Sequence, residues 1–222
     1  MRFVFFVAII LCFSACNFNI TPTFYIRDIQ DVISDKREIE IPIFIKLPAS
    51  DVDSCNSEIG QVIGILDTYG IDATLQSCSA DENNLFATAN VEFTASVVYS
   101  ENSQVKNFKG IVGLVVDEAG DGVYYLNLQA NPNLPKAMSD IEGALIFATL
   151  DASQVGFIIT LNNDTRRAVT FNIYDSFVNG VATDYNTFEL GPRSELEVRA
   201  SDVGANLFFN RGWFGLGDFT NN

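Results

Sequence analysis

The sequence contains no histidine and no Cys-X-X-Cys pair, and each absence removes a class of chemistry. Without histidine there is no imidazole for acid–base catalysis or for a histidine-based catalytic triad. Without clustered cysteine or histidine ligands, a zinc or haem site is also disfavoured. We therefore expect a protein with no metal and no cofactor.

Basic residues are scarce, because 13 Lys and Arg stand against 28 Asp and Glu, for a net charge of -15. This charge disfavours nucleic acid and anionic lipid headgroups as partners, and the simplest explanation for it is solubility. Hydrophobic residues make up 48% of the chain. That share is enough for a packed core and excludes a disordered acidic tail.

Long apolar runs are also missing, since the longest covers only residues 3–13. A membrane-spanning helix needs about 20 apolar residues, roughly twice that length. The run follows Arg2 and precedes the small pair Ser14 and Ala15. A basic start, a short apolar core and small residues before a cleavage site are typical of a secretory signal peptide, here residues 1–15.

The next residue gives this segment a more specific meaning. Phe13–Cys16 resembles the lipobox of bacterial lipoproteins, although that motif usually opens with Leu. The resemblance implies that Cys16 carries acyl chains, each buried methylene contributing about 0.8 kcal/mol to membrane attachment. Asn17 stands where Asp often signals retention in the inner membrane. The resemblance thus implies a lipid-anchored protein of the outer membrane that faces the periplasm, with surface exposure left open. The alternative is an ordinary signal peptide that leaves Cys16 free or disulfide-bonded.

The expected state of each remaining cysteine follows from this interpretation. Cys12 is lost with the signal peptide and Cys16 is lipidated, which leaves Cys55 and Cys78 in an oxidising compartment. Two such thiols predict one disulfide. A helix from Cys55 to Tyr69 rises about 21 Å, and a strand from Ile71 to Cys78 returns about 23 Å, so the two sulfurs can meet.

One feature opposes this pairing. Cys78 has the strand parity of the polar residues Thr74 and Gln76 and not that of the apolar Leu75. Twist or a bulge near the end of the strand is needed to bring Cys78 to the helix.

Hydrophobic periodicity predicts an α+β, β-rich fold. We expect a tether over residues 16–37, an α+β domain over 38–150 with an antiparallel sheet and one packed helix, and a small immunoglobulin-like β-sandwich over 151–222. The predicted helices are 27–34, 53–69 and 135–142. The predicted strands of the first domain are 38–47, 71–79, 85–99, 104–117, 122–129 and 145–150, with 85–129 forming an antiparallel meander. Those of the second are 155–161, 168–174, 187–190, 195–200 and 206–209. Pro42 cannot donate to a ladder, so strand 38–47 is predicted to be an edge strand or to have an unpaired N–H side.

The candidate sites of the chain are weak. Asp117, Glu118 and Asp121 flank glycines and could hold calcium, but the spacing of an EF-hand is absent and an acidic hairpin tip explains them better. A carboxylate-dependent hydrolase would need a paired acid and base, and no pair stands in a recognisable context. Asn19 and Asn163 match glycosylation sequons, which matter only in a eukaryotic source.

The order of these features resembles uncharacterised lipoproteins of phage and prophage origin. The resemblance depends on the lipobox, on strand 41–48, on the pair Cys55 and Cys78, and on segment 177–203. It implies no activity. We expect a non-catalytic, lipid-anchored binding module with a protein partner in the envelope, whose phage-related role could be receptor blocking or exclusion. The alternatives are a carboxylate-dependent hydrolase of cell wall or glycan and a structural envelope accessory protein.

Overall fold

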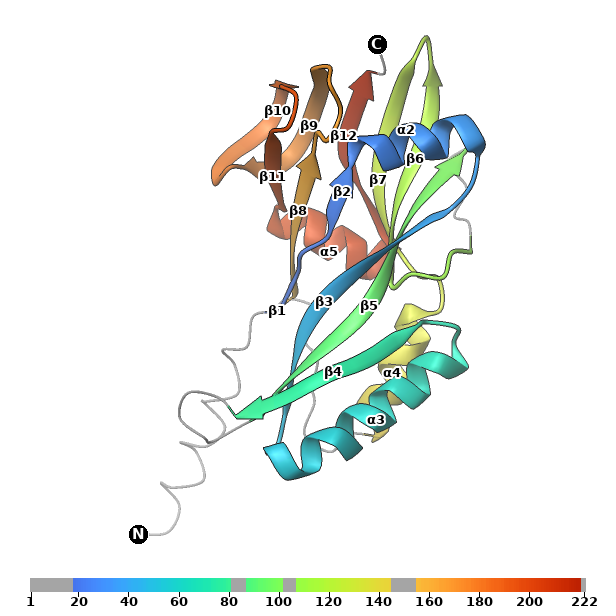
Figure 1. Ribbon diagram of the computed structural model, residues 1–222, viewed down its shortest axis with the longest axis vertical. Helices are drawn as coiled ribbons and strands as arrows, with labels where there is room; N and C mark the ends of the chain where they lie inside the picture. Colours follow the sequence, from blue (N-terminus) through green and yellow to red (C-terminus); the bar gives the residue numbers. More distant parts are fainter. Residues whose placement is uncertain (1–17, 81–86, 102–106, 145–154, 221–222) are drawn as a thin grey trace.

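The computed structural model describes residues 18–80, 87–101, 107–144 and 155–220 (Figure 1). The helices are α2 (Ile26–Asp35), α3 (Val52–Thr68), α4 (Leu134–Ala144) and α5 (Asp202–Arg211). The first strands are β1 (Phe18–Ile20), β2 (Thr23–Tyr25), β3 (Ile39–Ala49), β4 (Ala73–Ala80), β5 (Ala87–Ser100), β6 (Val112–Gly120) and β7 (Val123–Ala130). The remaining strands are β8 (Val155–Asn162), β9 (Val169–Val178), β10 (Val181–Leu190), β11 (Glu195–Ala200) and β12 (Trp213–Thr220).

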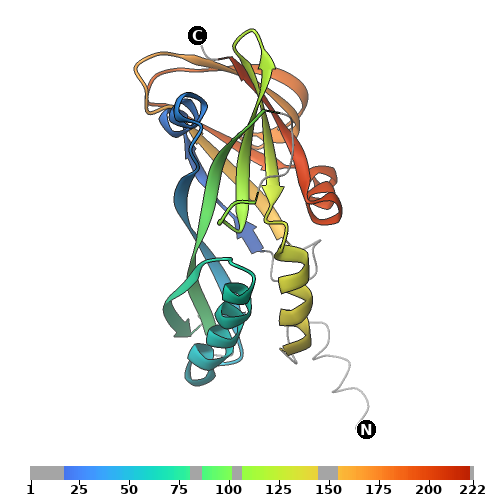
Figure 2. The ribbon, with the colours of Figure 1, turned by 90° about the vertical axis from the view of Figure 1, so that its right-hand side faces the viewer.

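One sheet joins all the described strands. Its main path runs β1-β8-β11-β9-β12-β7-β6-β5-β3, and β10, β2 and β4 pair beside β9, β8 and β5. The two ends of this path approach each other, because β1 lies against β3. The result is a nearly closed, barrel-like sheet, seen in Figure 2 as a strongly curved wall.

The predicted fold class is therefore wrong, because the chain does not form an N-terminal sheet followed by an immunoglobulin-like sandwich. The last strand, β12, inserts between β7 and β9 and pairs with both in antiparallel register. The first strands, β1 and β2, pair in parallel with β8. The predicted boundary at residues 150 and 151 lies outside the described residues, and strands from both sides of it share one sheet.

The core lies on the inner face of this sheet, where alternate strand residues point. Its largest fully buried side chains are phenylalanines from distant parts of the chain: Phe24, Phe157, Phe171, Phe208 and Phe219. Helix α2 contributes a fully buried stripe that includes Ile26 and Ile29, and α5 contributes Phe208. We call this part, made of α2, α5, β1, β2, β6–β12 and the upper half of β5, the body.

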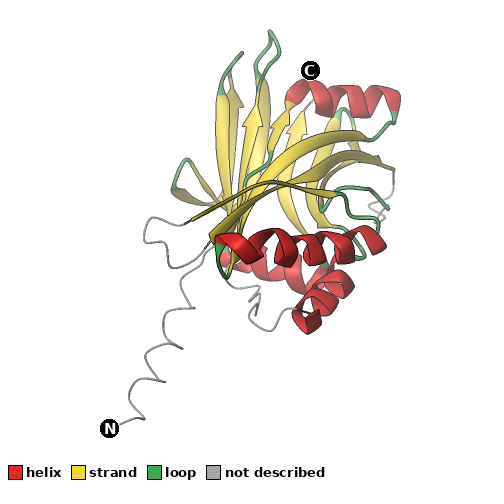
Figure 3. Cartoon of the chain, turned by 60° about the horizontal axis from the view of Figure 1, so that its bottom comes forward, coloured by secondary structure: helices red, strands yellow, loops and turns green. Residues whose placement is uncertain are grey.

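A second part projects from the body, and we call it the extension. It consists of β4, α3, α4 and the lower half of β5, with the part of β3 that pairs with that half, in the lower part of Figure 1. Figure 3 brings the bottom of the molecule forward and shows helices lying beside the strands there. Strand β5 belongs to both parts, because residues 95–100 pair with β6 while residues 87–93 pair with β4. Helix α3 buries Cys55, Ile59, Val62 and Leu66 toward these strands.

Strands β5 and β6 are parallel, so the predicted antiparallel meander over residues 85–129 is wrong at its first connection. The chain crosses back after Ser100, and β6 begins beside Ala95. The Ile111 N–H donates to the Thr94 carbonyl at 2.8 Å, which fixes this start. Strands β6 and β7 do form the predicted antiparallel hairpin.

The predicted strand 206–209 is also wrong, because these residues belong to α5. The Ser201 hydroxyl accepts a hydrogen bond from the Gly204 N–H at 3.1 Å, and Gly212 ends the helix at a φ of 79°. Serine at the N-cap and glycine after the last turn are the standard helix boundaries. These two signals outweigh the short apolar run between them.

Pro42 lies in an edge strand, as predicted, since β3 pairs only with β5 among the described strands. Its cross-strand partner Thr94 points its carbonyl toward Ile111, away from β3. In an antiparallel pair, when the backbone N–H and C=O of one residue point away from the partner strand, those of the opposite residue also point away. Pro42 and Pro48 therefore occupy positions where an N–H would face the free edge of β3. The two prolines protect this edge from pairing with another strand.

Candidate functional site

Four neighbouring strands present a group of polar and aromatic side chains on the outer face of the body. These strands are β7, β12, β9 and β10, side by side in the upper part of Figure 1. Register places Tyr125 beside Asp218, Asp218 beside Asn172, and Asn172 beside Thr187. Tyr174 and Tyr185 form the next pair along β9 and β10. We call these six residues the tyrosine face.

Asp218 is the centre of the tyrosine face and is only 7% exposed. Asn172 Nδ2 donates to Asp218 Oδ1 at 2.7 Å, and the Tyr174 hydroxyl donates to Oδ2. The Thr187 hydroxyl donates in turn to Asn172 Oδ1 at 2.7 Å. A hydrogen-bonded chain therefore joins β12, β9 and β10 and fixes the rotamers of its members.

The tyrosine rings differ in exposure. Tyr174 and Tyr185 stack with centroids 5.5 Å apart and planes 14° from parallel. Tyr185 is 63% exposed and Tyr125 is 46% exposed. The Tyr174 hydroxyl is bound by Asp218 and its ring stacks with Tyr185, so the exposed Tyr185 ring packs against an ordered neighbour.

Electrostatics keep Tyr174 protonated. Burial raises the pKa of the Tyr174 phenol above its ordinary value, and the hydrogen bond to the Asp218 carboxylate raises this pKa further. The phenol therefore remains a hydrogen-bond donor to Asp218 to a higher pH than an ordinary tyrosine would.

Gly217 lets β12 approach β9 closely enough to form this network. A Cβ atom at Gly217 would lie 2.0 Å from the Asn172 carbonyl oxygen, which is backbone and cannot move aside. The register of β12 against β7 also shifts between Gly215 and Gly217. The glycine and the irregularity together set the position of Asp218 opposite Asn172.

The strands around the tyrosine face are acidic. Strands β6, β7, β12, β9 and β10 contain no Lys or Arg. Their acidic residues are Asp117, Glu118, Asp175, Asp184, Glu189 and Asp218. The tyrosine face thus combines exposed aromatic rings with a negative electrostatic potential from the surrounding strands, and this combination is suited to binding.

The tyrosine face is not predictable from the sequence alone. Period-two alternation places Tyr125, Asn172, Tyr174 and Asp218 opposite to their buried neighbours, and this signal was available. What was missing is the order of the strands, because β12 follows β9 by more than thirty residues yet lies between β9 and β7.

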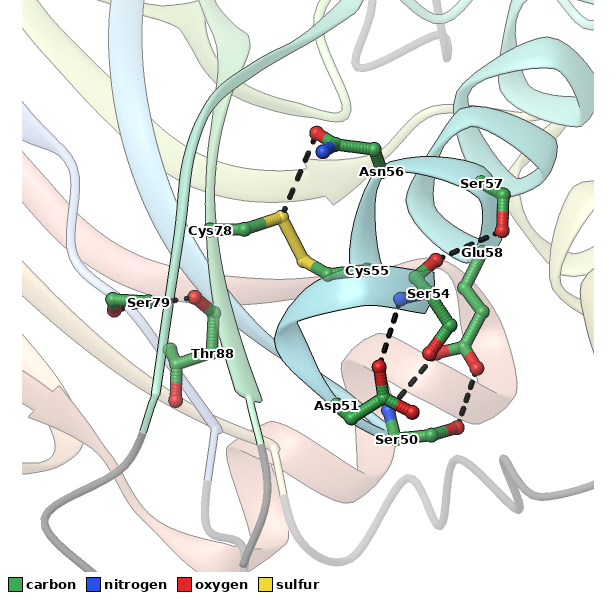
Figure 4. Close-up of a disulfide and its surroundings, with 10 residues drawn as sticks. All are labelled: Ser50, Asp51, Ser54, Cys55, Asn56, Ser57, Glu58, Cys78, Ser79 and Thr88. Atoms are coloured by element: carbon green, nitrogen blue, oxygen red, sulfur yellow. Dashed lines mark hydrogen bonds between the residues drawn. A yellow bond between two sulfur atoms is a disulfide. The ribbon is translucent and has the colours of Figure 1, made fainter. Parts of the chain in front are cut away.

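The predicted disulfide is present and lies in the extension, far along the sheet from the tyrosine face. Cys55 and Cys78 are bonded, with Cα atoms 6.3 Å apart (Figure 4). The register of β4 against β5 shifts between Leu75 and Ser77, which turns Cys78 toward the helix. This irregularity is the bulge that the parity of the sequence required.

Helix α3 is capped beside this disulfide. Asp51 Oδ1 accepts from the Ser54 N–H at 2.8 Å, so Asp51 is the N-cap and the helix begins at Val52, one residue before the predicted range. This hydrogen bond lowers the pKa of the Asp51 carboxyl below its ordinary value. Glu58 accepts from the Ser50 N–H at 3.0 Å and from the Ser50 hydroxyl, which ties the strand end to the helix (Figure 4).

Other predicted site residues have simpler environments. Asp117 and Glu118 point to opposite faces of the sheet, since they pair with Tyr125 and Tyr124, and Glu118 accepts from the Tyr99 hydroxyl at 2.6 Å. Among the residues that the structure describes, no group of three or more acidic or cysteine side chains could hold a metal ion. Cys16 and the rest of the lipobox lie outside the described residues.

The two sequons differ in exposure. Asn19 is exposed on β1. Asn163 is fully buried, and its Nδ2 donates to the carbonyls of Arg167, Leu190 and Gly191 at 2.8, 2.9 and 3.1 Å. Asn163 is therefore a structural residue of the turn before β9 and has no free amide for a glycan.

Comparison with known proteins adds a family and no activity. Within the described ranges, no helix is both long and apolar enough to cross a membrane. No curated protein and no solved structure matches the chain. A family described as a domain of unknown function, DUF7424, matches residues 18–220, which include both the body and the extension. The chain belongs to this DUF7424 family.

Proposed function

We propose that the protein is a lipid-anchored binding module of the bacterial envelope, held by Cys16 and presenting the tyrosine face to a protein partner. The observation that carries the binding role is the pair of exposed rings, Tyr125 and Tyr185, on strands to either side of a buried hydrogen-bonded carboxylate. Tyrosine offers a large contact area at little cost in side-chain entropy, and ordered exposed tyrosines are enriched where proteins bind one another.

The lipid anchor is supported by the lipobox resemblance at Phe13–Cys16. Cys16→Ser should abolish acyl labelling and move the protein from the membrane fraction to the soluble fraction. Cys55→Ser combined with Cys78→Ser is the control, since it removes the Cys55–Cys78 disulfide without touching the lipobox and should leave acyl labelling unchanged. Unaltered membrane association of Cys16→Ser would contradict the anchor.

The binding role is tested by crosslinking in intact cells, followed by affinity purification from membranes. We expect one dominant partner with the wild-type chain and much less of it with Tyr125→Ala combined with Tyr185→Ala. Both side chains are exposed, so the double variant should keep its fold, which a thermal melt checks. Turnover of peptidoglycan or model glycosides that depends on a single Asp or Glu would instead favour a hydrolase.

The resemblance to phage and prophage lipoproteins suggests one concrete biological role, the blocking of a receptor or the exclusion of an incoming phage. Cells that produce the wild-type chain should then resist infection by phages that use the blocked receptor. Cells that produce Tyr125→Ala with Tyr185→Ala at equal level should remain sensitive. Equal sensitivity of both strains to every phage tested would remove this role.

A further inference from the structure

The side chains of the tyrosine face are arranged in an order that favours one kind of ligand group. Across the strands the order is Tyr125, Asp218, Tyr174 and Tyr185. Tyr125 lies beside Asp218 on one neighbouring strand, and Tyr174, which stacks with Tyr185, lies on the other. A carboxylate bordered by aromatic rings is the arrangement that binds an organic cation.

Asp218 retains capacity to bind such a cation. Each of its oxygens accepts one of the two hydrogen bonds described above, from Asn172 and from Tyr174. A carboxylate offers about four acceptor positions, so further donors can bind. Because both existing donors are neutral, they leave the negative charge of the carboxylate uncompensated.

The protein does not supply the cation itself. Among the described residues, cations lie over three rings: Lys36 over Tyr99, Lys136 over Tyr69, and Arg199 over Phe177. None lies over Tyr125, Tyr174 or Tyr185. The Arg199 guanidinium lies 4.3 Å from the centre of the Phe177 ring, on the same β9 strand that carries Tyr174. The next aromatic side chain along this strand is thus covered by an arginine of the same chain, while Tyr125 and Tyr185 remain exposed.

We propose that the tyrosine face binds an arginine-bearing, basic surface of its protein partner, with one guanidinium stacked on an exposed tyrosine ring and hydrogen-bonded to Asp218. The inference is based on the proposed function and names the chemistry of the partner. Charge complementarity favours it, because the five strands around the site contain acidic residues and no basic ones. Arginine fits better than lysine, since its planar group stacks on rings and donates in parallel to a carboxylate.

The test is calorimetric titration of the full chain with the capped peptide Gly-Arg-Gly-Arg-Gly. We expect saturable binding that weakens with added salt. Tyr185→Ala should weaken binding by about five-fold and Asp218→Asn by about ten-fold. Asp67→Asn is the matched control, because it removes the same charge from an exposed residue of α3 in the extension, and it should leave binding unchanged. Replacement of Arg by Lys in the peptide should weaken binding.

Three outcomes would overturn the inference: no binding of the arginine peptide, equal binding by wild type and Asp218→Asn, or binding of a chitooligosaccharide in place of the peptide. Tyr185→Ala removes an exposed side chain, so it gives a second test if Asp218→Asn fails to fold. The crosslinking experiment separates this inference from the proposed function. A partner recovered equally by wild type and Asp218→Asn would overturn the arginine site and leave the binding role intact.

Discussion

The body and the extension are stabilised in different ways, although β3 and β5 run through both. The body buries five phenylalanines completely, and its sheet almost closes on itself. The extension packs two helices on a few strands, and the inner residues of β5 there include the small Ala87 and Ala89. Its covalent bond, Cys55–Cys78, joins α3 to the outermost strand β4. A small core leaves a deficit in apolar burial that a disulfide offsets.

The largest expected effect concerns the core of the body. Phe171 is fully buried and its ring lies 5.8 Å from that of Phe219, so Phe171→Ala should destabilise the protein by about 3–5 kcal/mol. Urea denaturation measures this change. Phe44→Ala is the control, because Phe44 is 52% exposed and its loss should cost little. Similar costs for the two variants would contradict this account of the body.

The disulfide should matter to the extension alone. Replacement of both Cys55 and Cys78 by Ala should lower the stability of the extension by about 3 kcal/mol, because the denatured loop gains conformational entropy. Hydrogen exchange followed by mass spectrometry should show faster exchange in α3 and β4 and unchanged exchange in β9 and β12. Equal acceleration in both parts would show that they unfold as one unit.

A smaller effect is expected where β12 enters the sheet of the body. Gly217→Ala places a methyl group against the backbone of Asn172 and should cost about 1–3 kcal/mol. Gly215→Ala is a matched control on the same strand, since its nearest neighbour would be Asn127 Oδ1 at an ordinary 3.6 Å. Thermal melts of both variants should separate them clearly. The same loss of stability in Gly215→Ala would mean that β12 tolerates no side chain at either position.

Helix capping gives a still smaller effect in the body. Ser201→Ala removes the acceptor for the Gly204 N–H and should destabilise α5 by about 1 kcal/mol. Ser34→Ala is the control, because its hydroxyl only donates to a carbonyl within α2. Denaturation midpoints compare the two. A shift in Ser34→Ala as large as that in Ser201→Ala would count against the cap.

The two parts should also respond to opposite ends of the pH scale. The pKa of Asp51 is lowered, so the stability that it gives to α3 is present above its ordinary value of 3.8 and is lost as the pH falls below it. In the body, the hydrogen bond to Glu118 and burial raise the pKa of Tyr99, and the pKa of Tyr174 is raised as well. Their contribution is complete below pH 10.0 and is lost as the pH rises from there toward the raised values. Hydrogen exchange at acid and alkaline pH would reveal the difference, and identical profiles in both parts would contradict it.

Local patterns in the sequence predicted most of the individual elements. Alternation located β3, β5, β7, β8 and β11, and the apolar stripe from Cys55 to Leu66 located α3. Asn179–Gly180 is a residue pair typical of tight turns, and both residues have positive φ in the structure. The disulfide was also predicted. The strand parity of Cys78 indicated that β4 needs a twist or a bulge, and the structure has an irregularity after Leu75.

The sequence by itself determined these elements because period-two and period-3.6 patterns, caps and turn residues act over a few neighbouring positions. Tertiary structure decided which strands pair, because alternation fixes the face of a strand and not its neighbour. Tertiary structure placed β12 between β7 and β9, and this joined the two predicted sheets into one. It also placed β6 parallel to β5. The tyrosine face exists only through those pairings, since they bring Tyr125, Tyr174 and Asp218 together from three separate strands.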